Sequence, residues 1–228
     1  MTGNKVIIIS NGETRQFPRN QLVSIAQSGQ KEIDLWSGDV TLGTNIRKGN
    51  TESVDISLLA TANRRTASSR IVLDYVGNHI EANNPETANS HRLSGFRDSF
   101  ISKKLFWRQL FAEYYRDPFK NIETQVSAYI SLGYHLVYTP ETEWDISAGL
   151  GLRETRYTSV EPGDDISSTS PVFGASTMYD TELTKAVDLL VDYNFQVVNE
   201  KAGTYTHHFI TTLETDLTGD IDLDISFI

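Results

Sequence analysis

Apolar and polar residues alternate along most of the chain, from about Leu35 to its C-terminal end. A clear example is the stretch in which Val126, Ile130 and Leu132 are separated by polar residues such as Ser127. Because successive side chains of a β-strand point to opposite faces, this period of two predicts strands with one apolar and one polar face. Turn-forming residues separate the stretches, so we expect antiparallel hairpins.

We predict ten strands in this region, most of them longer than the roughly five or six residues that are usual in soluble proteins. Their lengths match the roughly 9–11 residues of a tilted strand that crosses a bilayer. The fourth and fifth strands alternate poorly. The ten strands are expected at residues 35–46, 53–66, 69–82, 90–102, 104–116, 122–138, 143–158, 178–198, 204–217 and 220–228.

The predicted connections alternate in length along the chain. The longer ones cover residues 47–52, 83–89, 117–121 and 159–177, and the shorter ones cover residues 67–68, 103–104, 140–142 and 199–203. Outer-membrane barrels show this asymmetry, with long loops outside and tight turns on the periplasmic side. One exception is the tight turn Thr218–Asp220, which stands where a long loop is expected.

The first 30 residues differ from the rest. Lys5–Ser10 and Glu13–Pro18 flank Asn11-Gly12, a dipeptide that favours the tight type I′ turn of a β-hairpin. Two strands cannot bury a core alone. We therefore predict a small β-hairpin module or extension at residues 1–30, followed by a transmembrane-type barrel at residues 31–228.

Three motifs in this second region resemble the DUF481 (YdiY-like) family of salt-induced outer-membrane proteins. They are Trp36–Gly43 (WSGDVTLG), Lys48–Ser53 (KGNTES) and Phe111–Ile122 (FAEYYRDPFKNI), with Gly133-Tyr134 after them. The resemblance implies a bacterial outer-membrane barrel of unknown biochemical role, without catalytic residues to transfer. It also implies a further strand beyond Ile228, and hence a chain truncated at its C-terminus.

Composition changes this picture little. Hydrophobic residues make up 39% of the chain, which is low for a packed soluble core but suits a barrel with a polar interior. The net charge of −10, without a dense run of Lys or Arg, argues against nucleic acid as a partner. Cysteine is absent, which excludes disulfides and thiolate metal sites. The chain opens on no signal peptide, so an exported protein would have had it removed.

These observations together predict an all-β fold: an antiparallel up-and-down β-barrel of outer-membrane type, with about ten strands and twelve as the alternative. The expected partner is the lipid bilayer of the outer membrane of a Gram-negative bacterium. No cofactor is expected.

The last predicted hairpin carries the sharpest chemical feature. A three-residue loop would pair Leu217 with Ile221, Asp216 with Asp222, Thr215 with Leu223 and Glu214 with Asp224. Hard cations such as Ca²⁺ bind clustered carboxylate oxygens, so Glu214, Asp216, Asp222 and Asp224 form a candidate site for a divalent cation. The alternative is a solvated interior face countered by Arg or Lys from other strands, because the spacing is not that of a known calcium loop.

Three functions are compatible with the sequence. The first is a structural protein or a narrow passive pore with an acidic lumen, which is not an enzyme. The second is a soluble ligand-binding β-barrel, in which the apolar residues would face inward. The third is an outer-membrane lipid-modifying enzyme, although no nucleophile motif such as G-x-S-x-G is present.

Overall fold

The computed structural model describes residues 5–10, 13–18, 31–48, 52–83, 85–198, 204–218 and 221–227. β1 (Lys5–Ser10) pairs antiparallel with β2 (Glu13–Pro18), which confirms the predicted N-terminal hairpin. Its predicted turn, Asn11-Gly12, lies outside the described residues. The division into units at 1–30 and 31–228 stays a prediction.

A second sheet contains eleven strands, each paired antiparallel with its neighbours in the chain. The elements are η2 (Glu32–Leu35), β3 (Trp36–Arg47), β4 (Ser53–Arg65), β5 (Ser69–Ala82), β6 (Glu86–Phe100), β7 (Leu105–Asp117), η3 (Pro118–Lys120), β8 (Ile122–Tyr138), β9 (Thr142–Tyr157), β10 (Ser167–Thr184), β11 (Val187–Val197), β12 (Tyr205–Thr218) and β13 (Ile221–Phe227). The predicted all-β, up-and-down architecture is therefore confirmed.

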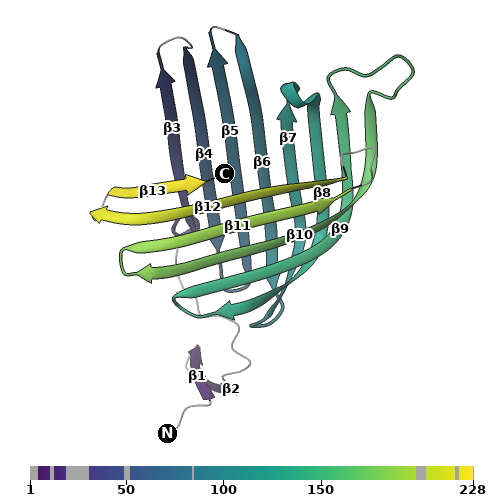
Figure 1. Ribbon diagram of the computed structural model, residues 1–228. Helices are drawn as coiled ribbons and strands as arrows, with labels where there is room; N and C mark the ends of the chain where they lie inside the picture. Colours follow the sequence, from purple (N-terminus) through teal and green to yellow (C-terminus); the bar gives the residue numbers. More distant parts are fainter. Residues whose placement is uncertain are drawn as a thin grey trace.

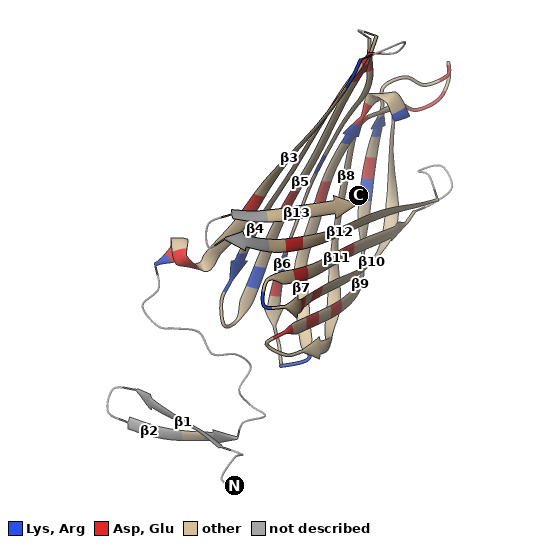
Figure 2. Ribbon diagram, turned by 60° about the vertical axis from the view of Figure 1, so that its left-hand side comes forward, with Lys and Arg blue, Asp and Glu red and all other residues tan. Residues whose placement is uncertain are grey.

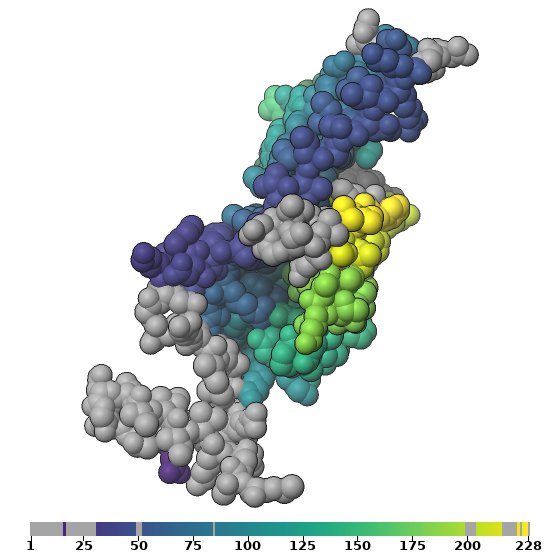
Figure 3. All heavy atoms as spheres, turned by 90° about the vertical axis from the view of Figure 1, so that its left-hand side faces the viewer, coloured from purple at the N-terminus to yellow at the C-terminus, as the bar shows by residue number. Residues whose placement is uncertain are grey.

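The long sheet curls, so that β9–β13 cross in front of β3–β8 (Figure 1). Within the described residues, β3 and β13 end the sheet and do not pair with each other, which makes the fold a half-barrel. Figure 3 looks onto this side, where the blue first strands and the yellow last strands both face the viewer. The interior is the concave face between these two walls.

The prediction of a loop at 159–177 and a single strand at 178–198 is wrong. β10 begins at Ser167, and β11 follows after the turn at Lys185-Ala186. The first half of β10 is rich in serine and contains Pro171, which is a loop signal. Its inward residues are Ser168, Ser170 and Val172, so only one of the three carries an apolar signal.

The additional strand also explains the exception in the loop pattern. With β10 included, the connections at 158–166 and 198–204 lie at the same end of the sheet, and the tight turn at 219–220 lies at the other end. The alternation does not hold in the middle of the sheet, where the predicted longer connection at 83–89 is wrong: the connection between β5 and β6 covers only residues 83–85, and the one between β6 and β7 covers residues 101–104.

The polarity of the two faces of the long sheet is the reverse of that in a soluble protein: apolar side chains point outward, and mainly polar ones point inward. The predicted apolar stripe of β8 faces outward, where Ile130 is 54% exposed and Leu132 is 64% exposed. The alternate residues Ser127 and Ser131 point into the interior and are buried. An apolar cluster around Phe96, Phe111 and Tyr129 fills part of the interior, but most buried residues are polar or charged.

Inward-facing glycines make room for aromatic rings. Gly133 on β8 pairs with Phe106 on β7, and a methyl group on Gly133 would overlap the Phe106 ring. Gly174 on β10 likewise lies under the ring of Tyr129, whose Cζ would be 2.6 Å from an added Cβ. Because both rings are buried, neither can swing into solvent. These glycines allow large side chains to fill a narrow interior.

Gly133→Ala should therefore lower the free energy of unfolding by about 1–3 kcal/mol, the usual effect of overpacking. Urea denaturation of the purified chain would measure the loss. Gly133→Ala combined with Phe106→Leu should recover part of it, because leucine leaves space for the methyl group. An equal or larger loss in the double variant would contradict the steric explanation.

Candidate functional site

The centre of the interior is a buried network of charges around Asp98 on β6. Its Oδ1 accepts a hydrogen bond from Arg108 Nε at 2.8 Å, and its Oδ2 accepts one from Arg70 Nη2 at 2.8 Å. Asp98 is fully buried, and both arginines are nearly so. The Arg108 guanidinium also lies 3.6 Å from the centre of the Phe96 ring. One carboxylate thus holds two buried cations from neighbouring strands.

Arg70 extends this network across the interior to β9. Its Nη2 donates to Asp145 Oδ2 at 2.7 Å, and its Nη1 donates to Glu143 Oε1 at 2.7 Å. The other carboxylate oxygen of Glu143 accepts from Arg65 Nη1 at 2.8 Å. Strands β5 and β9 are far apart in the sheet order, so these ion pairs join the two walls of the half-barrel.

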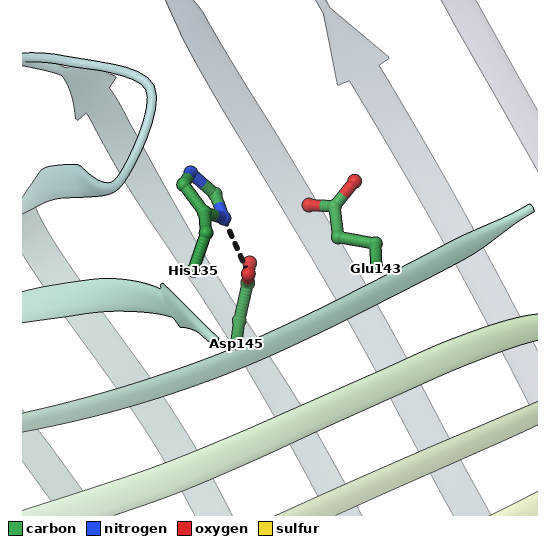
Figure 4. A group of neighbouring side chains, drawn as sticks. All are labelled: His135, Glu143 and Asp145. Carbon is green, nitrogen blue, oxygen red and sulfur yellow. Dashed lines mark hydrogen bonds and ion pairs between the residues drawn. The ribbon is translucent and has the colours of Figure 1, made fainter. Parts of the chain in front are cut away.

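His135, Glu143 and Asp145 form a compact group on this network, shown in Figure 4. One potential ligand atom from each lies within 4.8 Å of the others, and no second such group occurs in the described part of the chain. His135 Nδ1 is paired with Asp145 Oδ1. A metal ion here would have to displace Arg70 from both carboxylates, because its guanidinium already neutralises them. The arrangement is that of an ion-pair network.

The His135–Asp145 pair has the form of a general base with an orienting carboxylate. The ring of His135 packs against Phe100, Phe106 and Tyr138. In the described residues, no serine or threonine hydroxyl hydrogen-bonds to it. The pair therefore lacks the nucleophile of a hydrolase, and the enzymatic alternative remains a prediction from sequence.

A second polar network lies further along the same strands. Arg92 Nη2 contacts Glu113 Oε2 at 2.7 Å, and Glu113 Oε1 accepts from Gln196 Nε2 at 3.2 Å. Gln196 Oε1 in turn accepts from Arg153 Nη2 at 2.6 Å. This chain of contacts links β6, β7, β11 and β9.

A cavity of about 390 Å³ opens between the two walls. Four arginines and seven carboxylates line it, so its acidic groups outnumber its basic ones. Figure 2 shows that acidic (red) and basic (blue) residues occur along the strands of both walls. The arginines are Arg64, Arg65, Arg70 and Arg92, and the carboxylates are Asp39, Asp74, Glu143, Asp145, Asp180, Asp192 and Glu214.

The structure gives the backbone register of the predicted carboxylate site. Glu214 pairs with Asp224 and Asp216 with Asp222, as expected for the last hairpin. The predicted pairing of Leu217 with Ile221 is wrong, because the register shifts there and Thr218 is opposite Ile221. The side chains of Asp216, Asp222 and Asp224 lie outside the described residues, and Glu214 lines the cavity. The cation site stays a prediction.

The buried ion pairs were not foreseen from the sequence. Asp98 and Arg108 lie at inward positions of the two strands whose apolar alternation is weak, and Arg70 lies at an inward position of β5. The sequence does place charged residues at alternate positions of long strands, and this pattern could have indicated charged side chains in the interior. Their partners could not be assigned, because Arg70 and Asp145 are 75 residues apart.

A family model described as "Protein of unknown function, DUF481" matches residues 40–228. No curated protein matches the chain, and no solved structure does. Among the described residues, no helix is long and apolar enough to span a membrane.

Proposed function

From the premise that the chain belongs to the DUF481 family, whose function is unknown, we propose that it is a β-barrel protein of the Gram-negative outer membrane. Its interior is filled largely by side chains, and its partner is the lipid bilayer. The observation that carries the proposal is the inverted polarity of the long sheet.

The outer surface of the sheet is apolar where a soluble protein would be polar. Leu150 and Leu152 on β9 are 68% and 59% exposed, and they continue the stripe of Ile130 on β8. Soluble monomers rarely expose contiguous apolar patches larger than a few hundred Å². Lipid is the solvent for which such a surface is suited. In the bilayer the edges of β3 and β13 must also be paired or covered, because open sheet edges do not occur in the hydrocarbon region.

Aromatic residues near strand ends support the same proposal. Trp36, Trp107, Trp144 and Tyr138 are all more than a third exposed. Trp and Tyr are enriched where a membrane protein meets the lipid headgroups, because their rings are apolar and their N–H or O–H groups are polar. All four lie at one end of the sheet, where β3, β7 and β9 begin and β8 ends, as expected of one aromatic girdle of a transmembrane barrel. Phe119 and Tyr205, which are 53% and 57% exposed, lie at the opposite end.

A partition experiment tests the membrane assignment. The purified chain, diluted from detergent, should float with phosphatidylcholine vesicles and resist extraction by alkaline carbonate. Without detergent or lipid it should aggregate, because the apolar belt is exposed. A chain that stays monomeric in buffer and remains in the soluble fraction would overturn the proposal in favour of a soluble barrel.

A second candidate function, a narrow cation-preferring path, is favoured by the acidic cavity. Its excess of carboxylates should attract cations and exclude anions. In planar bilayers we expect a small K⁺-selective conductance that Asp74→Asn with Asp192→Asn reduces. Glu123→Gln, on an exposed residue paired with Arg156, is the control. Absence of conductance, or anion selectivity, would remove this function while leaving the membrane assignment intact.

A further inference from the structure

Asp74 on β5 and Asp192 on β11 line the acidic cavity and differ from its paired carboxylates. In the described part of the chain, neither accepts a hydrogen bond nor forms an ion pair. Glu143 and Asp145 line the same cavity, but Arg70 donates to both of them. Asp74 and Asp192 are half-buried. They are therefore accessible from the cavity, but they are neither paired by the protein nor fully hydrated.

These two carboxylates lie on opposite walls of the half-barrel, because β11 crosses in front of β5 (Figure 1). They are close enough to repel each other. Arg92 is within electrostatic reach of both, but its Nη2 already contacts Glu113 Oε2 at 2.7 Å. Arg108, which is within reach of Asp192, is already bound to Asp98. A positively charged ligand between the two carboxylates would relieve their repulsion.

An apolar surface adjoins both carboxylates. Val72 lies two residues before Asp74 on the same face of β5, and Met178 is the cross-strand partner of Asp192. Met178 packs against the apolar cluster that contains Val72 and Phe96, and all three line the cavity. The cavity therefore presents two negative groups beside a continuous apolar floor.

This combination argues for an organic cation rather than a metal ion. Ca²⁺ takes roughly six to eight oxygen ligands, and an apolar floor supplies none. The cavity has a volume of about 390 Å³. Pockets that hold small organic molecules have volumes of roughly 300–1,000 Å³. An ammonium group on an apolar body would place its charge between the carboxylates and its body against the floor.

We propose that the cavity binds a small organic monocation, in which an ammonium group is attached to an apolar body. Asp74 and Asp192 hold the ammonium group, and Phe96 and Met178 contact the body. The proposal rests on the same acidic cavity as the narrow cation path, but it requires binding and not conduction. It does not depend on the membrane assignment, because the cavity belongs to the fold itself.

Isothermal titration calorimetry of the purified full chain in a non-ionic detergent tests the proposal, with phenethylammonium as the probe and protein-free micelles as the baseline. We expect saturable binding of one probe molecule per chain. Phenethyl alcohol keeps the ring without the charge, and ammonium keeps the charge without the ring. Each should bind about tenfold more weakly or worse, since each lacks one of the two contacts. No saturable binding of phenethylammonium, or equal binding of either fragment, would overturn the proposal.

Asp192→Asn should weaken the binding of phenethylammonium about tenfold or more, because it removes one carboxylate partner of the ammonium group. The thermal unfolding midpoint of the ligand-free variant should stay the same or rise, since a repulsion is removed with the charge. Asp74→Asn gives the same comparison from the opposite wall. Glu123→Gln, on an exposed residue paired with Arg156, should bind the probe as the parent chain does.

Unchanged affinity in both aspartate variants would contradict the assigned site. The titration uses neither a bilayer nor a conductance measurement. A failure to bind the probe is therefore distinguishable from a failure of the membrane assignment, which the partition experiment tests, and from a failure of the cation path, which planar bilayers test.

Discussion

Replacing Asp98 with alanine should lower the free energy of unfolding by about 3–5 kcal/mol, the usual cost of removing one partner from a buried ion pair. Asp98 is fully buried and neutralises both Arg70 and Arg108. Without it, the contacts of Arg108 within the described part of the chain are a hydrogen bond to Ser176 and the aromatic rings beside its guanidinium. The Arg108 guanidinium would then be buried without water or a counter-ion, and this unfavourable burial of a charge causes the loss of stability.

Urea denaturation of the refolded chain in detergent or lipid measures this loss. Glu123→Ala is the matched control, because Glu123 pairs with Arg156 on the exposed surface and such pairs contribute about 0–1 kcal/mol. Adding Arg108→Met to Asp98→Ala should recover part of the stability, since it removes one of the two buried charges that have lost their carboxylate partner. A loss below about 1 kcal/mol for Asp98→Ala would show that water reaches these arginines.

Replacing Ile130 with arginine should destabilise the membrane-inserted protein by about 2–4 kcal/mol, the cost of a cationic side chain at the middle of a lipid-facing strand. Ile130 is central in β8 (Ile122–Tyr138), is 54% exposed, and pairs with the equally outward Leu150. In a soluble barrel the same change would place a charge in water and cost almost nothing. The loss of stability caused by Ile130→Arg therefore distinguishes a lipid-facing position from a water-facing one.

Reversible unfolding in phospholipid vesicles measures the effect of Ile130→Arg. Val160→Arg is the matched control: Val160 is also apolar and exposed, but it lies in the connection between β9 and β10. Its cost should be about 0–1 kcal/mol, as at the membrane interface. Equal stability of the Ile130→Arg variant and the parent chain in lipid would contradict a lipid-facing position.

Polar segments were the hardest to assign from the sequence. The first half of β10 was predicted as loop because Ser168 and Ser170 carry no apolar signal and Pro171 argues against a strand. The weak alternation of β6 and β7 has a structural cause: register shifts follow Arg97 and Arg108, and Phe96 and Phe111 face inward. A shift changes the face on which every later residue lies, so simple periodicity fails there.

The sequence by itself determined most of the strand-and-turn pattern, the division of each strand into an apolar and a polar face, and the register of the carboxylates in the last hairpin. These are local properties, because a period of two and a short turn act between neighbours in the chain. The structure decided that the apolar face points outward. Only the tertiary structure decided that Arg70 meets Asp98 and Asp145, and that Arg153 is buried without a carboxylate contact among the described residues. Such contacts depend on how far the sheet curls and how its strands are staggered, which joins residues from opposite walls.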